Sequence, residues 1–477
     1  MKRLSKFLDK NLMVINTPTT KLSIFGLAIP IFLENIGAHL IAMIQTILSS
    51  NFMDGFFVSP MNIAVSAAAP ITTLSTVVTV GLNIVLSINL GRGNQKDSAK
   101  IVGTAIYANF LFSIFLNSIV SFFAEPIISF MGYNTAEYAE AFPYAVDYLK
   151  KQSIVLMVIR ITGCFLTILR CYGYTKIGMY STLISSAVLT GLTAIMLFVI
   201  SPAKEYVVDG FIICRLIVRI AEAIILYLIL LKKKISVSFK LSRKWFKEIF
   251  RIGFPANIAN LAYTISSVLT VKICVSLGPD PYLARIYIQQ IVFFVYTFGA
   301  CVGVANSIMI GRLCGMGDLD KADKMHRQNI RLIMLINGIL SLLCIPIGIL
   351  ILRFGFNASD IIIALSVPVF IIDFFVEVGR GMNHIGQNGL NATKDVKFTT
   401  MVSIIAVFLF SVGLAYVFGV IFKLGISGIW LAYAVDEISR GILYYFRWRK
   451  GRWRKRFKAE EEKFKNEASK TQPAPAI

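Results

Sequence analysis

The sequence predicts an all-α membrane protein with twelve transmembrane helices, arranged as two parallel-repeat bundles of six. Three observations support this prediction. Of the 477 residues, 56% are hydrophobic and 16% are charged, whereas soluble domains carry roughly 25% charged residues. Twelve apolar stretches are long enough to cross a bilayer, which takes roughly 20 helical residues. Motifs in the first half of the chain recur in the same order in the second half.

The twelve expected spans follow one another along most of the chain. They cover residues 24–48, 58–90, 98–123, 138–170, 176–200, 206–231, 246–277, 282–311, 321–353, 359–390, 396–421 and 425–446. The basic start lacks the short apolar core and small-residue cleavage site of a signal peptide, so the first apolar stretch is interpreted as span one. Several stretches exceed 30 residues, which indicates tilt or extension into the membrane interface.

Lysine and arginine are concentrated in alternate connections. The N-terminus, the tail and the connections on their side hold 36 basic residues, whereas the opposite connections hold about three. The positive-inside rule then predicts a multi-pass protein of the cytoplasmic (inner) membrane with both termini in the cytoplasm. The formal net charge of +22 is therefore an orientation signal and does not indicate nucleic-acid binding. We expect the Arg-Trp tail to contact anionic lipid headgroups.

Three correspondences reveal an internal repeat. Pro30 matches Pro255 at an offset of 225, Gly91 matches Gly315 at 224, and residues 169–176 match residues 390–397 at 221. Each half has an even number of spans, so the halves share one orientation, and such repeats usually place a substrate cavity between them. We therefore predict a cytoplasmic N-terminus (1–23), an N-lobe (24–231), a basic linker (232–246), a C-lobe (247–446) and a tail (447–477).

Two charged segments flank the C-lobe. Leucine, tryptophan and phenylalanine alternate with lysine and arginine in residues 231–251, a pattern typical of a helix that lies in the membrane interface. The end of the tail, from residue 459, is polar, charged and rich in proline and alanine. That composition predicts disorder.

Several function classes are not supported by the sequence. The seven cysteines are scattered without a C-x-x-C pair, which argues against a disulfide framework or a zinc site. The loops GRGNQKDSA and GRLCGMGDLDKA lack the G-K-[ST] of a phosphate-binding loop. The three histidines, His39, His326 and His384, are well separated. We therefore expect neither an enzyme nor a resident cofactor.

Span one carries polar residues at helical spacing. Asn35 and His39 lie four residues apart on one face, and Glu34 and Gln45 lie eleven apart, near one face. Pro30 leaves a carbonyl without a partner one turn earlier and permits a bend. We predict that these residues bind substrate or ion, with Gln45 facing the cavity. The alternative is that Glu34 only caps the span or pairs near its cytoplasmic end.

Span ten carries a longer polar stripe. Asp373, Glu377, Arg380 and Asn383 follow one another at steps of four, three and three. The spacing of Glu377 and Arg380 permits an ion pair within the helix. Two acids beside one arginine leave a negative charge uncompensated, which predicts a site for a proton or for sodium near Asp373 and Glu377. Ionisable groups inside a membrane usually mark such pathways.

A structural interpretation of the same stripe stays open. Span twelve carries Asp436, Glu437 and Arg440, and the two clusters could interlock as ion pairs; we interpret the span-twelve set as mainly structural. In span seven Asn260 and Tyr263, and in span eight Gln289, are further candidates for the cavity. Asparagine in a membrane helix more often joins helices than binds ligands.

With these motifs in place, the sequence resembles the multidrug and toxic compound extrusion (MATE) transporters over residues 20 to 455. The resemblance rests on the prolines of spans one and seven, the glycine-rich loops and the end of span ten. Glu377, Arg380 and Asn383 fit a bacterial pattern E-x-x-R-x-x-N, and residues 392–395 fit A-T-G-D with lysine in place of glycine. The last span, GIWLAYAVDEISRG, fits G-I-W-x-A-x-x-x-D-E-x-x-R-G.

The resemblance implies a monomeric antiporter for multidrug efflux. Such transporters export amphipathic organic cations, including xenobiotics, against inflowing sodium or protons, by alternating access, and their other partners are membrane lipids. Many members carry an acid late in span one, where this chain has Gln45, and a glutamate in span seven, where this chain has none. The coupling carboxylates of this chain are therefore expected elsewhere, and Glu377 is the main candidate.

Two alternatives share the architecture. A flippase for lipid-linked saccharides should line its cavity with basic residues, and the chain offers Arg160, Arg215, Arg219, Lys272 and Arg285 within its spans. A homologue that no longer transports and serves as a receptor or scaffold is compatible with the missing family acids.

Overall fold

The computed structural model describes residues 13–16, 21–50, 57–131, 134, 139–238 and 240–470. The chain groups into two compact units. We call them the N-unit, which comprises Pro30–Leu86 and Gln95–Gly253, and the C-unit, which comprises the residues up to Ile29, Ser87–Asn94 and the residues from Phe254. The division into lobes at residues 24–231 and 247–446 stays a prediction. The two units differ from these lobes at Ser87–Asn94 and at the chain start.

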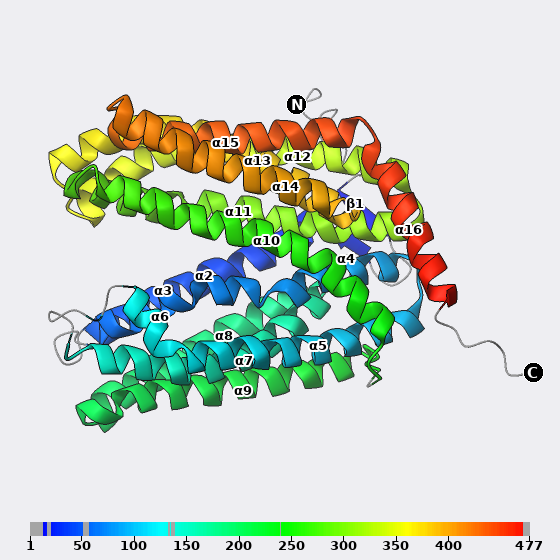
Figure 1. Cartoon of the computed structure of the whole chain (residues 1–477), viewed down its shortest axis with the longest axis horizontal. Helices are drawn as coiled ribbons and strands as arrows, with labels where there is room; N and C mark the ends of the chain where they lie inside the picture. Colours follow the sequence, from blue (N-terminus) through cyan, green and yellow to red (C-terminus); the bar gives the residue numbers. More distant parts are fainter. Residues whose placement is uncertain are drawn as a thin grey trace, which may run out of the picture. The chain divides into compact units, whose positions relative to one another are not determined.

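Long helices make up the N-unit (Figure 1). Its elements are α2 (Ile24–Ser50), α3 (Val58–Leu74), α4 (Val77–Gly91), α5 (Gln95–Phe122), α6 (Ala124–Phe130), α7 (Phe142–Cys171), α8 (Thr175–Ile195), η4 (Met196–Ile200), η5 (Lys204–Tyr206), α9 (Val207–Lys232) and the start of α10 (Arg243–Val275). The first residues of α2 and the last of α4 belong to the C-unit.

The C-unit begins with a short antiparallel hairpin, in which β1 (Val14–Asn16) pairs with β2 (Lys21–Ser23). After α10 follow α11 (Pro279–Met316), α12 (Leu319–Leu350), η6 (Ile351–Gly355), α13 (Asp360–Ala392), α14 (Val396–Ala406), η7 (Val407–Leu414), η8 (Val417–Ile421), α15 (Gly425–Arg449) and α16 (Arg452–Lys470). Within this unit α13 packs along α15, α11 and α12, and it is the central helix of the candidate site.

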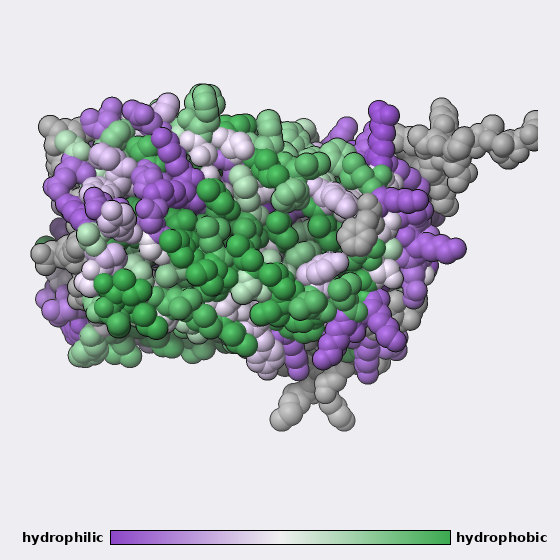
Figure 2. Space-filling model, turned by 90° about the horizontal axis from the view of Figure 1, so that it is seen from below, coloured by the Kyte–Doolittle hydropathy of each residue, from purple (hydrophilic) through white to green (hydrophobic). Residues whose placement is uncertain are grey.

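Within the described residues, ten helical segments are long and apolar enough to cross a membrane. The helices at the places of spans six and twelve, α9 and α15, are long as well, but each carries three charged residues within its apolar part. The observed bounds lie within a few residues of the expected ones in most cases. The face in Figure 2 shows apolar residues gathered in a band, with hydrophilic residues toward its two ends. The prediction of an all-α, twelve-helix membrane fold is confirmed.

The repeat is visible in the backbone of the connections. Gly93 and Gly317, 224 residues apart, have φ of 72° and 81°. Ser201 and Lys423 have φ of 46° and 56°, and each follows a π-helical turn, η4 or η8. Matching turns therefore end matching helices in the two halves.

One pair of matching turns differs in its residue type. Gly173 has φ of 89°, whereas its counterpart Lys394 has φ of 64°. A residue with a Cβ atom in this left-handed region costs about 1–2 kcal/mol relative to the right-handed one. The place where the bacterial pattern has glycine is thus strained in this chain.

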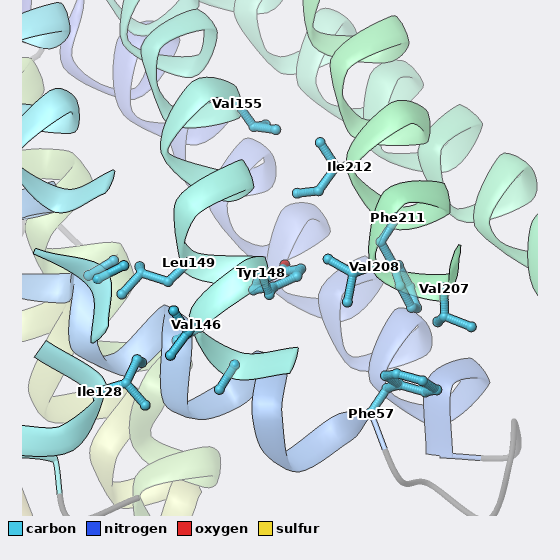
Figure 3. Packing of buried hydrophobic residues seen from close by; sticks show 14 of the residues in the cluster. Phe57, Ile128, Val146, Tyr148, Leu149, Val155, Val207, Val208, Phe211 and Ile212 are labelled. Carbon is cyan, nitrogen blue, oxygen red and sulfur yellow. The ribbon is translucent and has the colours of Figure 1, made fainter. Parts of the chain in front are cut away.

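Helices α7 and α9 contribute many of the residues in a buried hydrophobic cluster of the N-unit. Figure 3 shows Val155 and Tyr148 of α7 facing Ile212, Val208 and Phe211 of α9. These side chains are at most 5% exposed. Inside a membrane such packing stabilises the helices through van der Waals contact rather than through removal from water, and the shared cluster holds the two helices in one register. That register also sets the positions of their polar residues.

The predicted interfacial helix at residues 231–251 is not found as such. Helix α9 ends at Lys232 and α10 begins at Arg243, and the described residues between them are not helical. The Ser238 amide instead donates to the Ala99 carbonyl at 3.0 Å. Gly103 permits this approach, since a Cβ there would collide with the Ser238 carbonyl. Here the backbone forms a hydrogen bond with α5 and does not adopt the helix that the alternation of side chains predicts.

Residues 459–470, predicted to be disordered, continue helix α16. The helix is anchored at its start, where the Trp453 ring stacks on Trp448 with centroids 4.3 Å apart. Further along, Glu461 pairs with Arg92 and, at 2.9 Å, with Lys394. Because of these contacts with other segments of the C-unit, residues 459–470 are helical although their polar composition predicts disorder.

Candidate functional site

The C-unit encloses a cavity of about 290 Å³. Four of the predicted site residues line it: Tyr263, Gln289, Asp373 and Arg380. The other lining residues are Ser266, Ser267, Thr270, Val292, Phe293, Tyr296, Ser411, Trp430, Tyr433 and Glu437. Residues from α10, α11, α13, η7 and α15 thus come together around one space. Two residues of the polar stripe of span ten, Asp373 and Arg380, thus line a cavity within the C-unit itself.

Arg380 joins the acids of α13 to those of α15. Its guanidinium pairs with Glu377 on the same helix, and its Nε donates to Glu437 Oε1 at 3.2 Å. Glu437 Oε1 also pairs with Arg440 Nη2 at 3.1 Å. Arg440 in turn donates to both carboxylate oxygens of Asp436, at 2.9 and 2.6 Å. The two predicted clusters therefore interlock, as the structural alternative required.

Asp373 stands at the cavity wall with one free acceptor. Its Oδ1 accepts a hydrogen bond from Trp430 Nε1 at 3.0 Å. Its Oδ2 is buried without a hydrogen-bond partner in the described part of the chain, and the residue is 2% exposed. A buried oxygen that bears charge and lacks a donor is costly. It is also the acceptor that a bound cation would satisfy.

Glu377 and Asn383 lie behind the cavity wall. Glu377 is fully buried, and its Oε2 has no hydrogen-bond partner among the described residues. Asn383 Nδ2 donates to Glu437 Oε2 at 2.6 Å. Both residues hold the arginine–carboxylate network in place, and neither lines the cavity. Glu377 therefore acts on the cavity through Arg380.

Aromatic rings complete the wall. The Tyr296 ring lies under the Arg380 guanidinium at 5.3 Å, and the Trp430 and Tyr433 rings meet edge to face with centroids 5.5 Å apart. Tyr433 also donates from its hydroxyl to Thr270 Oγ1 at 2.9 Å. Aromatic faces attract cations by about 0.5–2 kcal/mol. The wall thus combines carboxylates with aromatic rings, one of which already contacts Arg380.

The charges of the network do not balance. Among the described residues, Arg380 pairs with Glu377 and Glu437, and Arg440 pairs with Asp436 and Glu437. A fourth acid, Asp373, lines the same cavity as Arg380. With every group ionised, the network carries two negative charges in excess. Proton uptake or a bound cation relieves such an excess, and these two events compete for the same oxygens.

No group of three or more histidine, cysteine, aspartate or glutamate side chains is placed to hold a metal ion, as far as the described residues extend. A sodium site near Asp373 and Glu377 would therefore draw on hydroxyl, carbonyl or water oxygens as well, the ligands that hard cations prefer. Ser411 and Thr270 line the same cavity and carry hydroxyls. The sodium site stays a prediction.

The predicted residues of span one are not brought together as one site. Gln45 alone lines a second cavity, in the N-unit, and its Nε2 donates to Thr190 Oγ1 at 3.3 Å. Glu34 accepts from Arg170 Nη2 at 2.7 Å, which agrees with the alternative that Glu34 forms a pair, although the sequence did not name its partner. Asn35 donates to the Ile31 carbonyl at 2.7 Å. His39, like Asn35 and Glu34, does not line that cavity.

Several residues that line the cavity were not predicted as binding residues. In the C-unit, Asn260 is exposed and does not line the cavity, whereas Trp430, Tyr433 and Glu437 do. These three follow one another at steps of three and four residues, a helical face that was readable in the sequence. The sequence interpretation places Glu437 in a mainly structural cluster and names neither Trp430 nor Tyr433 as a binding residue.

Comparisons with known proteins match segments in both halves of the chain. The family profile described as MatE matches residues 30–196 and 255–417. The uncharacterized transporter YisQ of Bacillus subtilis strain 168 is 26% identical over 436 residues, which cover 90% of this chain and 94% of that protein. The probable multidrug resistance protein NorM of Thermotoga maritima is 24% identical over 468 residues, 94% of this chain and 96% of its own.

Solved structures show the same fold. A mutant of the Vibrio cholerae MATE transporter VcmN superposes with a TM-score of 0.80 at 14% identity, over 90% of this chain and 96% of that chain. A MATE transporter in the straight conformation superposes with a TM-score of 0.78 at 16% identity, over 91% of this chain and 96% of that one. Both structures share the helical architecture with this chain.

Proposed function

Since the chain belongs to the MatE family and is a bacterial MATE transporter, we propose that it is a secondary active antiporter for amphipathic organic cations. It exports these compounds in exchange for sodium ions or protons by alternating access. Members of the family are transporters and not enzymes, and the chain is a multi-pass membrane protein. The relatives named multidrug resistance proteins support efflux of several compounds rather than of one metabolite.

The observation that carries this proposal is the negative excess around the C-unit cavity. Two acids of that network, Asp373 and Glu437, line the cavity directly. Phe293, Tyr296 and Trp430 surround the same space. Carboxylates attract a positive charge, and aromatic faces favour the flat apolar body that accompanies it. A neutral or anionic compound gains much less from this wall.

Exchange follows from competition for the same carboxylates. An incoming sodium ion or proton neutralises Asp373 Oδ2, the oxygen without a donor in the described chain. The organic cation then loses its counter-charge and leaves. Because Gln45 stands where many family members carry an acid, the C-unit carboxylates supply the coupling charge in this chain. Glu377 supports them through Arg380.

The proposal places the protein in the cytoplasmic (inner) membrane as a monomer, with both termini in the cytoplasm. The excess of lysine and arginine in alternate connections supports this orientation. The basic end of the chain then lies beside anionic headgroups, and membrane lipids are its other partners. The two alternatives, a saccharide flippase and a receptor without transport, gain no support from the acidic cavity.

Transport in proteoliposomes tests the proposal. Purified protein is reconstituted, and uptake or efflux of a cationic dye is followed with a sodium gradient or a proton gradient imposed separately. We expect gradient-driven transport that Asp373→Asn abolishes. Asp360→Asn is the matched control, because Asp360 lies on the same helix, outside the cavity, with a side chain 94% exposed. Absence of dye movement under both gradients, or full activity of Asp373→Asn, would refute the assignment.

A further inference from the structure

The cavity of the N-unit has the opposite charge character. Its volume is about 210 Å³, and it is lined by residues of α2, α3, α7, α8 and α9. Its polar lining residues are Gln45, Ser49, Asn62, Tyr148, Thr193 and Arg215, and the remainder are apolar. No acid is among the lining residues that the structure describes. One arginine therefore sets the charge of this space.

Arg215 has no acidic partner in the described structure. Every described acid on the five lining helices is paired with another base. Glu34 pairs with Arg170 at 2.7 Å, Asp147 and Asp209 with Lys151 at 2.8 and 2.6 Å, and Glu222 with Arg219 at 2.6 Å. Helices α3 and α8 carry no acid. A guanidinium cannot lose its proton in this environment, so the positive charge remains uncompensated.

The environment of Arg215 leaves most of its donors available. Its Nη1 donates to Gln152 Oε1 at 3.3 Å, and its guanidinium lies 5.8 Å from the Tyr148 ring. One of five N–H donors is thus used within the described residues. The amide bond and the ring fix the orientation of the side chain without neutralising it.

Tyr148 supplies a second unused polar group. The residue is 1% exposed, and its hydroxyl is buried without a hydrogen-bond partner in the part of the chain that the structure describes. Figure 3 shows the side chain beside Val208 and Phe211 of α9. A buried hydroxyl is normally satisfied, and an exception calls for an explanation. A ligand oxygen in the cavity provides one.

We propose that this cavity binds the carboxylate of a small organic molecule. The planar fork of Arg215 matches the two oxygens of a carboxylate, and the Tyr148 hydroxyl and the Gln45 amide are further donors at the same wall. Met61, Val65 and Phe211 give the apolar part of the ligand a surface. Drug-sized ligands fill about 300–1,000 Å³, so a cavity of this volume holds one small group.

The inference goes beyond the export of cations, and it stands without that proposal. It rests on Arg215 and Tyr148 in the N-unit, whereas the proposed cation site rests on Asp373 and Glu437 in the C-unit. If both hold, the protein accepts compounds that carry an acidic group as well as compounds that carry a basic one. If dye transport fails, the carboxylate site is still measurable by equilibrium binding.

Binding of benzoate to the purified protein in phosphatidylcholine nanodiscs tests the inference. Benzamide and benzylamine are the neutral and cationic analogues of the same shape, and calorimetry gives the affinities. We expect benzoate to bind and benzamide to bind at least about tenfold more weakly, since hydrogen bonds between a guanidinium and a carboxylate are stronger than those to a neutral amide. Equal affinities for benzoate and benzamide would overturn the proposal.

Three variants locate the site. Arg215→Gln should lower benzoate affinity about tenfold or more, and Tyr148→Phe should lower it several-fold while leaving folding intact, because it removes a hydroxyl that has no described partner. Lys232→Gln is the matched control, because it removes a positive charge from an exposed residue at the end of the same helix, and it should bind benzoate as the wild type does. Unchanged affinity in both Arg215→Gln and Tyr148→Phe would overturn the site assignment.

Titration with inorganic ions shows whether the site prefers an organic carboxylate or an inorganic anion. Chloride and phosphate are titrated into the same protein, alone and in competition with benzoate. Weak competition by either ion supports a site for an organic carboxylate. Binding of phosphate or chloride that depends on Arg215, without any binding of benzoate, would refute the carboxylate and indicate an inorganic anion or a lipid phosphate.

Discussion

Replacing Arg380 by glutamine should strongly destabilise the C-unit. Arg380 is 11% exposed and binds two carboxylates, those of Glu377 and Glu437, which are 0% and 4% exposed. After the substitution Glu437 keeps Arg440 and Asn383 as donors. Glu377 keeps none among the described residues, because its second oxygen already lacks a partner.

The expected loss of unfolding free energy follows from this difference between Glu437, which keeps donors, and Glu377, which keeps none among the described residues. Removing one partner of a buried ion pair costs about 3–5 kcal/mol, mainly because a buried charge is left uncompensated. The double variant Arg380→Gln, Glu377→Gln removes that charge, so it should recover most of the loss. The coupling energy between the two positions should then be at least about 2 kcal/mol, within the range for residues in contact.

Equilibrium unfolding of the detergent-solubilised protein, followed by tryptophan fluorescence, measures these free energies. Arg353→Gln is the control, because Arg353 is 60% exposed and lies 3.5 Å from the exposed Asp360. Such a surface pair contributes about 0–1 kcal/mol. If Arg380→Gln unfolds at the wild-type midpoint, or if the double variant is less stable than the single one, the described network does not hold the C-unit together.

Three further predictions follow from contacts in the structure, and one of them compares two glycine substitutions. Trp430→Phe removes the only described donor to Asp373 and should lower the free energy of unfolding by about 1–3 kcal/mol; no change in chemical denaturation would contradict it. Gly379→Ala places a Cβ 2.9 Å from the backbone of α15 and should lower the free energy of unfolding by about 1–3 kcal/mol. Gly191→Ala places a Cβ with nothing within 4 Å and should raise the free energy of unfolding by about 0.5–1 kcal/mol. Equal stabilities of the two variants would refute the packing argument. Glu461→Gln releases the two basic side chains that it bridges and should speed tryptic cleavage within α16, measured by gel; an unchanged rate would show that the bridge does not anchor the helix.

The candidate site was predictable in part. The stripe of Asp373, Glu377 and Arg380 was visible because polar residues at helical steps stand out in an apolar span. Its interlock with span twelve was open, since spacing along one helix says nothing about which helix lies opposite. Glu34 illustrates the same limit, because its partner Arg170 is 136 residues away.

The connections show where local patterns fail. Lys394 occupies a left-handed turn that its repeat counterpart fills with Gly173, and only the backbone reveals the strain. The segment after Lys232 has the alternation of an interfacial helix, yet its backbone pairs with α5. The tail from residue 459 has a disordered composition, yet Glu461 and Trp453 anchor the helix that contains its residues up to Lys470; residues 471–477 lie outside the described part of the chain. In each case contacts with distant residues outweigh the local preference.

The sequence by itself determined the membrane class, the span positions, the repeat and the resemblance to MATE transporters, because these depend on hydropathy, charge placement and the order of motifs along the chain. Only the tertiary structure decided which polar residues share a cavity. It assigned Asp373 and Glu437 to an acidic cavity and Arg215 and Tyr148 to a basic one. The physical reason is that the cost of a buried charge depends on its neighbours in space, and those neighbours come from different helices.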